Sequence, residues 1–301
     1  MPDLPPISAI VPAHTRFDTL SKSLSAILAC DPPPDELIVH VDGGAEEIVR
    51  QVRAAFPAVK ILCSDKLLGP GGSRNALVEA AANEWVANFD EDSYPETGGY
   101  FGRLKALIAR FPEAAMFSAA SNDQEKKETM IQKVAIPSGC GCVFRRSWVQ
   151  RTGGFVPLPI GYCMEEVDMG LRLLAEGGQV FMDPLLRVVH DKIPPEHISA
   201  ELSAGVFRNT VLFPFLRFPV WLWPLGAWAV MRRLFSCLAR GWVDGLADGL
   251  STTPAHLVNH LSYRRTIPGP KVLRWFMLRW KPQHVIPADE VRVLMESTYK
   301  R

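Results

Sequence analysis

Short apolar runs rich in β-branched residues alternate with amphipathic stretches from the start of the chain to about residue 190. The apolar runs predict strands at Ile7–Val11, Glu36–Val41, Val59–Cys63, Trp85–Phe89 and Ala114–Ser118. Between them, apolar residues recur at helical spacing in Thr19–Ala29, Glu46–Ala55, Gly72–Ala82 and Gly99–Arg110. This alternation is typical of βαβ units and predicts an α/β fold with a Rossmann-like, mainly parallel sheet flanked by helices.

The regular alternation weakens after about residue 120. The polar stretch Ser121–Lys133 predicts an exposed loop. The pattern then predicts a strand at Gly139–Phe144, a helix at Glu165–Glu176, and two short strands, Gln179–Met182 and Leu186–Val189, that end at His190. Beyond about residue 197 the composition changes to Arg, Trp, Phe, Leu and Pro with helical periodicity, so we expect a domain over 1–196 and a mainly helical carboxyl-terminal region over 197–301.

Overall charge and cysteine usage narrow the range of functions. The 33 Lys and Arg residues nearly cancel the 32 Asp and Glu residues, so no global field favours nucleic acid as a partner. The six cysteines show neither a disulfide rhythm nor a Cys-x-x-Cys pair, and the first residues lack an export signal. We therefore expect a cytoplasmic protein with reduced thiols.

Polar residues directly follow three of the predicted strands. The first strand leads into Pro12, His14 and Arg16, the second into Asp42, and the fourth into the Asp90–Asp92 triplet. In sheets of this kind ligands bind outside the carboxyl ends of the strands, so these residues are candidates for a binding site.

Two segments of the chain suit a nucleotide. Asp42 can accept a hydrogen bond from a nucleobase or ribose, although Asp-Gly is also common in ordinary turns. Gly69–Asn75 forms a glycine-rich turn before a helical run, where backbone N–H groups can meet phosphate, and Arg74 offers a planar fork to a base edge or a diphosphate. The same turn can also be no more than a helix start.

Three other residues suit a divalent cation. Asp90 and Asp92 can hold Mg²⁺ or Mn²⁺, and the alternative is a solvated acidic loop. His190 follows a predicted strand and can be a third ligand, although a lone histidine is also compatible with a structural role.

A third group of carboxylates, Glu165, Glu166 and Asp168, begins a predicted helix. Negative charge at this position stabilises the helix dipole, which is one explanation for them. The other is that one of the three takes a proton from an attacking hydroxyl group as a general base.

Taken together and in this order, these segments resemble the inverting glycosyltransferases of family 2, which have a GT-A fold. The resemblance covers about residues 7–191. On the donor side it includes the opening Val11–Arg16, the second-strand Asp motif Val41–Gly44, the helix start Gly72–Asn75 and the Asp-x-Asp motif Asp90–Asp92. Further on it includes the acceptor-side segments Gly139–Phe144 and Gly153–Phe155 and the acidic helix from Glu165 to Leu173. It implies that Pro12, His14, Arg16, Asp42, Arg74 and Asp90 bind the nucleotide, that Asp92, Asp90 and His190 hold Mg²⁺ or Mn²⁺, and that Glu166 is the base.

Two residues depart from the family pattern. Thr15 stands where the family commonly has Asn, and Glu166 stands where it commonly has Asp. The choice of base among Glu165, Glu166 and Asp168 therefore stays open.

The implied function is transfer of a sugar, with inversion, from a nucleotide-diphosphate donor to a saccharide or lipid-linked acceptor, as in polysaccharide biosynthesis. A nucleotidyltransferase that makes nucleotide sugars is an alternative, but it needs a glycine-rich phosphate loop where Pro12, Ala13 and His14 stand. A glycoside hydrolase leaves Asp42 and Arg74 unexplained. A non-catalytic protein that binds sugar nucleotides or membranes is the alternative from another class.

The carboxyl-terminal region combines aromatic and basic residues on predicted helices, as in Trp221, Trp223, Trp228, Arg232 and Arg233. This combination suits the interface of a membrane, here the inner face of the cytoplasmic membrane. It equally suits packing against the catalytic domain or a second subunit. Arg217 and three prolines interrupt the one long apolar stretch, about 206–230, which counts against a membrane-spanning helix.

Overall fold

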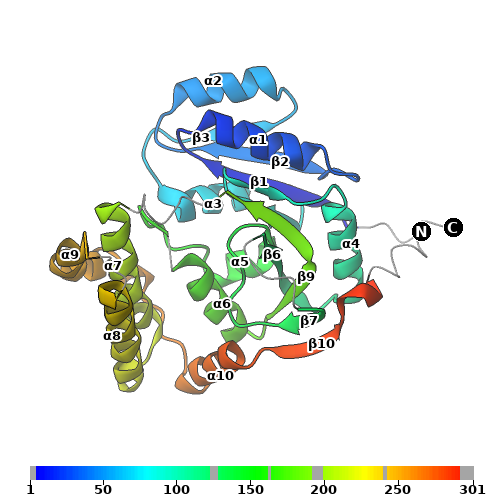
Figure 1. Ribbon diagram of the computed structural model, residues 1–301. Coiled ribbons are helices and arrows are strands. Elements are labelled where there is room, and N and C mark those ends of the chain that lie inside the picture. Colours follow the sequence, from blue (N-terminus) through cyan, green and yellow to red (C-terminus); the bar gives the residue numbers. More distant parts are fainter. Residues whose placement is uncertain (1–4, 123–127, 162–163, 192–198, 240–242, 292–301) are drawn as a thin grey trace.

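The computed structural model describes residues 5–122, 128–161, 164–191, 199–239 and 243–291, and these residues fold around one central sheet (Figure 1). Its strands are β1 (Ile7–Ala13), β2 (Glu36–Val41), β3 (Lys60–Cys63), β4 (Trp85–Asn88), β5 (Ser93–Pro95), β6 (Ala114–Ser121), β7 (Met130–Lys133), β8 (Cys142–Arg145), β9 (Gln179–His190) and β10 (Gln283–Pro287). Their order across the sheet is β10-β7-β9-β6-β8-β4-β1-β2-β3, and β5 pairs with β9.

The sheet is parallel where the sequence alternates most regularly. Strand β1 pairs in parallel with β2 and β4, and β2 does so with β3; β6 and β9 are also parallel. Strand β8 lies antiparallel between β4 and β6, and β5, β7 and β10 add further antiparallel pairings. The predicted α/β architecture is confirmed, with a mixed extension beyond the first four strands.

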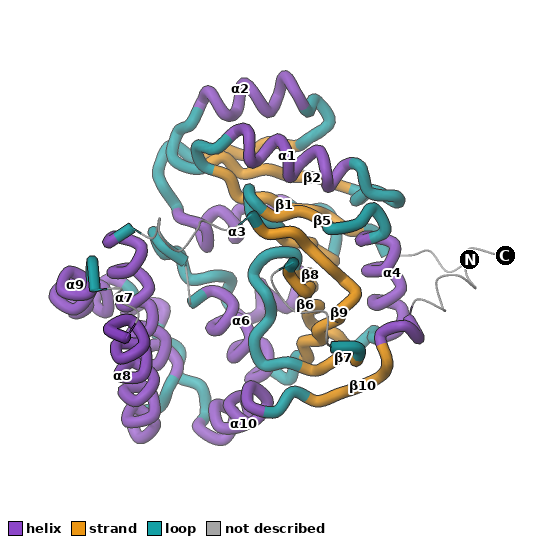
Figure 2. Tube along the Cα trace, in the orientation of Figure 1, coloured by secondary structure: helices purple, strands orange, loops and turns teal. Residues whose placement is uncertain are grey.

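Helices cover both faces of the sheet (Figure 2). The described helices are α1 (Phe17–Leu28), α2 (Glu46–Ala55), α3 (Gly69–Ala80), α4 (Tyr100–Arg110), α5 (Arg146–Thr152), α6 (Glu165–Ala175), α7 (Ala200–Arg217), α8 (Trp223–Ala239), α9 (Leu246–Asn259) and α10 (Gly269–Trp280). Apolar residues of α1, α2 and α4 share one core cluster, and those of α3, α5 and α6 share a second.

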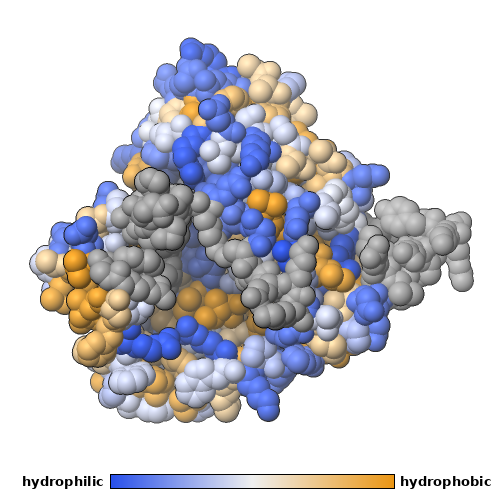
Figure 3. Space-filling view, viewed as in Figure 1, coloured by the Kyte–Doolittle hydropathy of each residue, from blue (hydrophilic) through white to orange (hydrophobic). Residues whose placement is uncertain are grey.

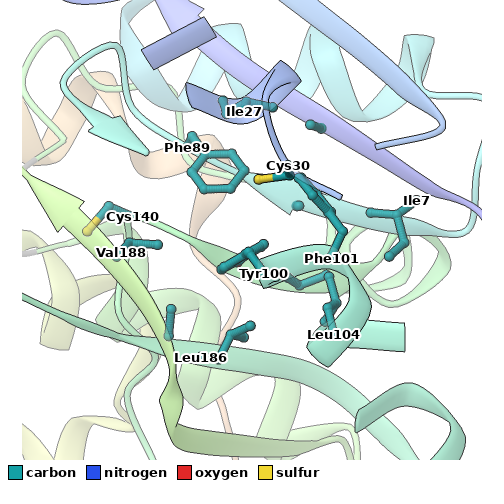
Figure 4. Close-up of a cluster of buried hydrophobic side chains, with 14 of the residues drawn as sticks. Ile7, Ile27, Cys30, Phe89, Tyr100, Phe101, Leu104, Cys140, Leu186 and Val188 are labelled. Atoms are coloured by element: carbon teal, nitrogen blue, oxygen red, sulfur yellow. The ribbon is translucent and has the colours of Figure 1, made fainter. Parts of the chain in front are cut away.

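Strand β1 shows how the sequence separates these two cores. Successive side chains of a strand point to opposite faces, so Ile7, Ala9 and Val11 enter the first core and Ile10 enters the second. Figure 4 shows part of the first core, where the ring of Phe89 lies beside Cys30 and above Tyr100. The centroids of these two rings are 5.5 Å apart.

A third core joins the carboxyl-terminal helices to the sheet domain. Leu158 and Leu171 pack in one cluster with Leu212 of α7 and Trp275 of α10, and the Trp275 indole Nε1 donates to the backbone oxygen of Ala135 at 2.9 Å. In the parts of the chain that the structure describes, no helix is both long enough and apolar enough to cross a membrane.

The structure differs from the sequence-based expectations in three segments. Part of the predicted loop Ser121–Lys133 is strand β7, and residues 123–127 lie outside the described residues. The two short strands predicted before His190 are one strand, β9, whose pairing with β6 shifts register near Pro184. The region predicted to be mainly helical also supplies strand β10, which pairs with β7.

Candidate active site

A cavity of ≈540 Å³ lies at the carboxyl ends of β1, β2, β4 and β9, between the first turns of α3 and α6. Its lining includes all but one of the residues that the sequence singled out, namely Pro12, His14, Arg16, Asp42, Arg74, Asp90, Asp92, Glu165, Glu166 and His190. Residues up to 178 positions apart in the chain therefore meet in one place, because parallel strands end at the same edge of the sheet.

Asp90, Asp92 and His190 form a group that fits a divalent cation. One ligand atom of each lies within 4.8 Å of the others. Strand β5 begins directly after Asp92 and pairs antiparallel with the end of β9, so that Ser93 lies opposite His190. Two carboxylates and an imidazole are oxygen and nitrogen donors of the kind that Mn²⁺ accepts, and the carboxylates also suit Mg²⁺.

The charges around Asp92 keep it ionised. Burial alone would raise the pKa of its carboxyl group, but hydrogen bonds and charges from His190 and Arg16 outweigh burial and hold that pKa below its usual value. The His190 Nε2 lies 3.4 Å from Asp92 Oδ1, and its hydrogen bond to Asp92 raises the pKa of His190 to about 10. Asp92 is thus negatively charged at neutral pH.

Arg74 holds two of the carboxylates together. It is buried at the start of α3 and forms ion pairs with Asp90 and Glu165, while its Nε donates to Asn88 Oδ1 at 3.1 Å. Asn88 also donates to the backbone oxygen of Gly139 at 2.8 Å. Asn88 was not among the predicted site residues, and its only sequence signal is a polar residue at the end of an otherwise apolar strand.

Glu165 and Glu166 both line the cavity, and they differ in their contacts. Burial outweighs the attraction of Arg74 and raises the pKa of Glu165 to about 7, and its Oε1 has no hydrogen-bond partner among the described residues. Burial also raises the pKa of Glu166. Glu166 lies against Gly139, where an added Cβ would be 2.1 Å from its Oε1, so the absence of a side chain at residue 139 provides room for this carboxylate.

Asp168, the third predicted candidate for the base, does not line the cavity. Its carboxylate accepts from Arg172 Nε at 2.8 Å and from Arg217 Nη2 at 3.1 Å, and it is buried in the interior. Burial alone would raise the pKa of Asp168, but the charges of Arg172 and Arg217 outweigh burial and hold that pKa below its usual value. Asp168 is therefore engaged by two arginines away from the cavity, and the choice of base among the three carboxylates stays a prediction.

Asp42 lines the cavity but its oxygens are already engaged. They accept hydrogen bonds from Ser64 Oγ at 2.8 Å, from the Leu68 backbone N–H at 2.9 Å and from the Gly69 backbone N–H at 2.8 Å. Gly69 has φ +72° and an added Cβ there would lie 2.1 Å from the backbone oxygen of Leu158. Asp42 thus fixes the loop that begins α3 and carries Arg74.

The opening segment after β1 is tied to the acidic triplet. The His14 backbone N–H donates to Glu91 Oε2 at 3.0 Å, and Arg16 bonds Glu91 at 2.6 Å and Asp92 at 3.1 Å. Glu91 makes these contacts although no sequence pattern distinguished it from its neighbours. Its contacts reach back more than 70 residues, which a local pattern does not reveal.

Comparison with known proteins agrees with this geometry. Residues 8–154 match the model of glycosyl transferase family 2. The chain is 30% identical over 120 residues to the succinoglycan biosynthesis protein ExoO of Rhizobium meliloti (40% of this chain, 33% of the relative) and 30% identical over 145 residues to the galactofuranosyltransferase GlfT1 of Mycobacterium tuberculosis (46% of each). These alignments span from a third to just under half of the relatives' lengths.

A solved structure gives the same fold over most of the chain. The mannosyltransferase PcManGT of Pyrobaculum calidifontis, in complex with GDP-Man and Mn²⁺, superposes with a TM-score of 0.57 over 91% of this chain and 84% of its own, at 17% identity. The chain is therefore similar to glycosyl transferase family 2 over residues 8–154, and it has the GT-A fold of its structural neighbours.

Proposed function

We propose that this protein transfers a sugar, with inversion of the anomeric carbon, from a nucleotide-diphosphate donor to a hydroxyl group of a saccharide or lipid-linked acceptor. The observation that carries the proposal is the single cavity in which a cation-binding group, a buried arginine and two further carboxylates meet. Residues 1–196 would be the catalytic domain, and 197–301 would contact a membrane surface or a second subunit.

Asp90, Asp92 and His190 would hold Mg²⁺ or Mn²⁺. The donor set fits either ion, and PcManGT, which has the same fold, was solved with Mn²⁺ and a nucleotide sugar. A divalent cation in such a site supplies charge neutralisation for a departing nucleoside diphosphate.

The chain's own residues would bind and orient the donor. Pro12, His14, Arg16 and Asp42 lie at the side of the cavity formed by β1 and β2, where a nucleoside would rest. Arg74 carries a fixed positive charge at the cavity floor, since Glu165 and Asp90 favour its charged form more strongly than burial opposes it. It would meet the base edge or the diphosphate, in agreement with its planar donor fork.

Glu166 is our candidate for the general base. A base must be ionised and yet accept a proton readily, and burial raises the pKa of Glu166 in that direction. Glu165, in contrast, already forms an ion pair with Arg74, which makes it a positioning residue for that arginine. The acceptor hydroxyl would give its proton to Glu166 as its oxygen attacks the anomeric carbon, and the sugar–phosphate bond would break on the opposite side.

Release of the leaving group tests the proposal. The full-length protein is incubated with GDP- and UDP-sugars, a panel of acceptors and Mn²⁺ or Mg²⁺, and the nucleoside diphosphate set free is measured with and without EDTA. We expect release that requires both metal and acceptor. Formation of pyrophosphate instead would indicate a nucleotidyltransferase, and metal-dependent binding without turnover across the panel would indicate a non-catalytic binding protein.

A further inference from the structure

The carboxyl-terminal segment is strongly basic although the whole chain is nearly neutral. Residues 202–288 contain eleven Lys and Arg residues and only two acidic residues, Asp244 and Asp248. The same segment contains six of the eight tryptophans. Positive charge and aromatic side chains are therefore concentrated in one part of the molecule, and the remainder carries the excess of carboxylates.

Helix α8 exposes an apolar stripe instead of burying one. Trp228, Met231, Phe235 and Leu238 follow at intervals of three and four residues, which places them on one side of the helix. Trp228 is 66% exposed and Phe235 is 61% exposed. In this helix only Gly226 is buried among the described residues, so α8 packs little of its surface against the rest of the protein.

Helix α10 has a similar stripe and lies next to α8. Leu273, Met277 and Trp280 follow at intervals of four and three residues, and Trp280 is 78% exposed. The ring of Trp221, just before α8, lies over Gly269 at the start of α10, where an added Cβ would be 2.0 Å from that ring. We call the exposed residues of these two helices the α8/α10 face. Figure 1 shows α8 at the lower left and α10 at the bottom of the molecule, and Figure 3 shows hydrophobic residues gathered at the left edge.

Three cations of this face form no ion pair in the described part of the chain. Within the described ranges, no ion pair joins Arg232, Arg274 or Lys281 to an acidic side chain. The charge of Arg232 is near enough to α10 to add to burial in lowering the pKa of Arg279. Beside α10 lies a further cavity of ≈1070 Å³, lined by Arg274, Lys281 and Lys133 and by no acidic residue.

We propose that the α8/α10 face binds the surface of a bilayer that contains anionic lipid. Tryptophan rings favour the headgroup region, the apolar stripes would enter the acyl boundary, and unpaired Arg and Lys side chains would meet lipid phosphates. A second copy of the chain is a poorer occupant, because a two-fold contact would bring together two faces that both carry an excess of positive charge. The proposal does not rest on sugar transfer, since binding to lipid needs neither donor nor acceptor.

Vesicle sedimentation tests this inference on the full-length protein without nucleotide. Vesicles of phosphatidylcholine alone are compared with vesicles that contain phosphatidylglycerol in addition, at low and high salt. We expect binding to the anionic vesicles at low salt, weakened by high salt, and much weaker binding to phosphatidylcholine alone. Equal binding to both kinds of vesicle, or none to the anionic kind, would overturn the proposal.

Matched variants locate the contact. Arg232→Gln combined with Lys281→Gln should lower the partition coefficient about thirtyfold, because each cation at an anionic surface contributes about 1 kcal/mol. Its control is Arg50→Gln combined with Arg53→Gln on the exposed side of α2, which should change binding little. Trp228→Ser should also weaken binding, whereas Leu185→Ser, an exposed apolar residue on β9, should not.

Circular dichroism and nucleotide-sugar binding confirm that each variant is folded. Loss of vesicle binding in both control variants to the same extent would contradict the assignment to α8 and α10. Sedimentation equilibrium would likewise overturn it if the protein were a dimer that Trp228→Ser dissociates, since the face would then be covered by a second copy.

Discussion

Two clusters of buried charge on helix α6 differ in the ratio of acids to arginines. In the first, which we call the cavity cluster, Arg74 forms ion pairs with two carboxylates, Asp90 and Glu165. In the second, which we call the interior cluster, Arg172 and Arg217 both form ion pairs with one carboxylate, Asp168. Glu165 and Asp168 are only three positions apart in the sequence.

The difference in ratio changes what each cluster can do. In the interior cluster the pKa of Asp168 is lowered, and its carboxylate is permanently charged and bound. In the cavity cluster burial, together with the negative charges of Glu166 and Asp90, raises the pKa of Glu165 to about 7, and Asp92 adds a further carboxylate to the cavity. A buried excess of carboxylates is stabilised by protons or metal ions, which makes the first cluster suited to chemistry and the second to structure.

The largest effect should follow from removing a carboxylate on the cavity side. Asp92→Ala should lower the rate of nucleoside diphosphate release about a thousandfold or more, since it takes away a metal ligand whose ion contributes several kcal/mol. The Tm should change little. Asp191→Ala, which removes a neighbouring exposed carboxylate, is the control. A folded Asp92→Ala protein with normal turnover would remove Asp92 from the mechanism.

Removing the carboxylate of the interior cluster should have the opposite consequence. Asp168→Asn leaves Arg172 and Arg217 buried without a negative partner and should lower the free energy of unfolding by about 3 kcal/mol. Urea denaturation measures this loss, and turnover of the folded fraction should stay near normal. A stable Asp168→Asn protein that had lost turnover would instead place Asp168 in the catalytic machinery.

A smaller effect separates the two glutamates of the cavity. Glu166→Gln should lower kcat about a hundredfold or more with donor affinity unchanged, as expected for loss of a general base. Glu165→Gln, its matched control, should mainly weaken donor binding because Arg74 loses its partner. If kcat fell only in Glu165→Gln, the base would be Glu165.

The smallest effect concerns a histidine on α9 that belongs to neither cluster. Burial, together with His260 and Arg208, lowers the pKa of His256 on α9 to about 4. Between pH 6.5 and pH 4 the unfolded chain therefore binds a proton that the folded chain does not, so the free energy of unfolding falls as the pH falls through this range. Because the ring is half-buried, His256→Gln should reduce that fall by about 1 kcal/mol in urea titrations at pH 7 and pH 5. An identical fall in both proteins would contradict the assignment.

The sequence predicted those features that depend on local patterns. The first four parallel strands follow from short apolar runs, and the residues at their ends converge because of the sheet geometry. Asp90, Asp92 and His190 meet as expected although nearly 100 residues lie between them. Strand β7 was not predicted, because it lies in a polar stretch without an apolar alternation. It forms by pairing with β9 and β10.

Long-range partners explain why the site was predicted incompletely. Nothing local distinguishes Asp168 from Glu165, because both are acidic residues in the first turn of α6. Their roles differ because Arg217 reaches one from α7, 49 residues away, and Arg74 reaches the other from α3, 91 residues away. Such pairings become visible only in the folded chain.

The position of a bound manganese ion tests the central claim most directly. A crystal of the protein grown with Mn²⁺ and a nucleoside diphosphate should give an anomalous difference peak beside Asp92 and His190, with the diphosphate in the cavity that Arg74 and Glu166 line. An ordered nucleotide bound on another surface, or a manganese peak away from Asp90, Asp92 and His190, would contradict the account.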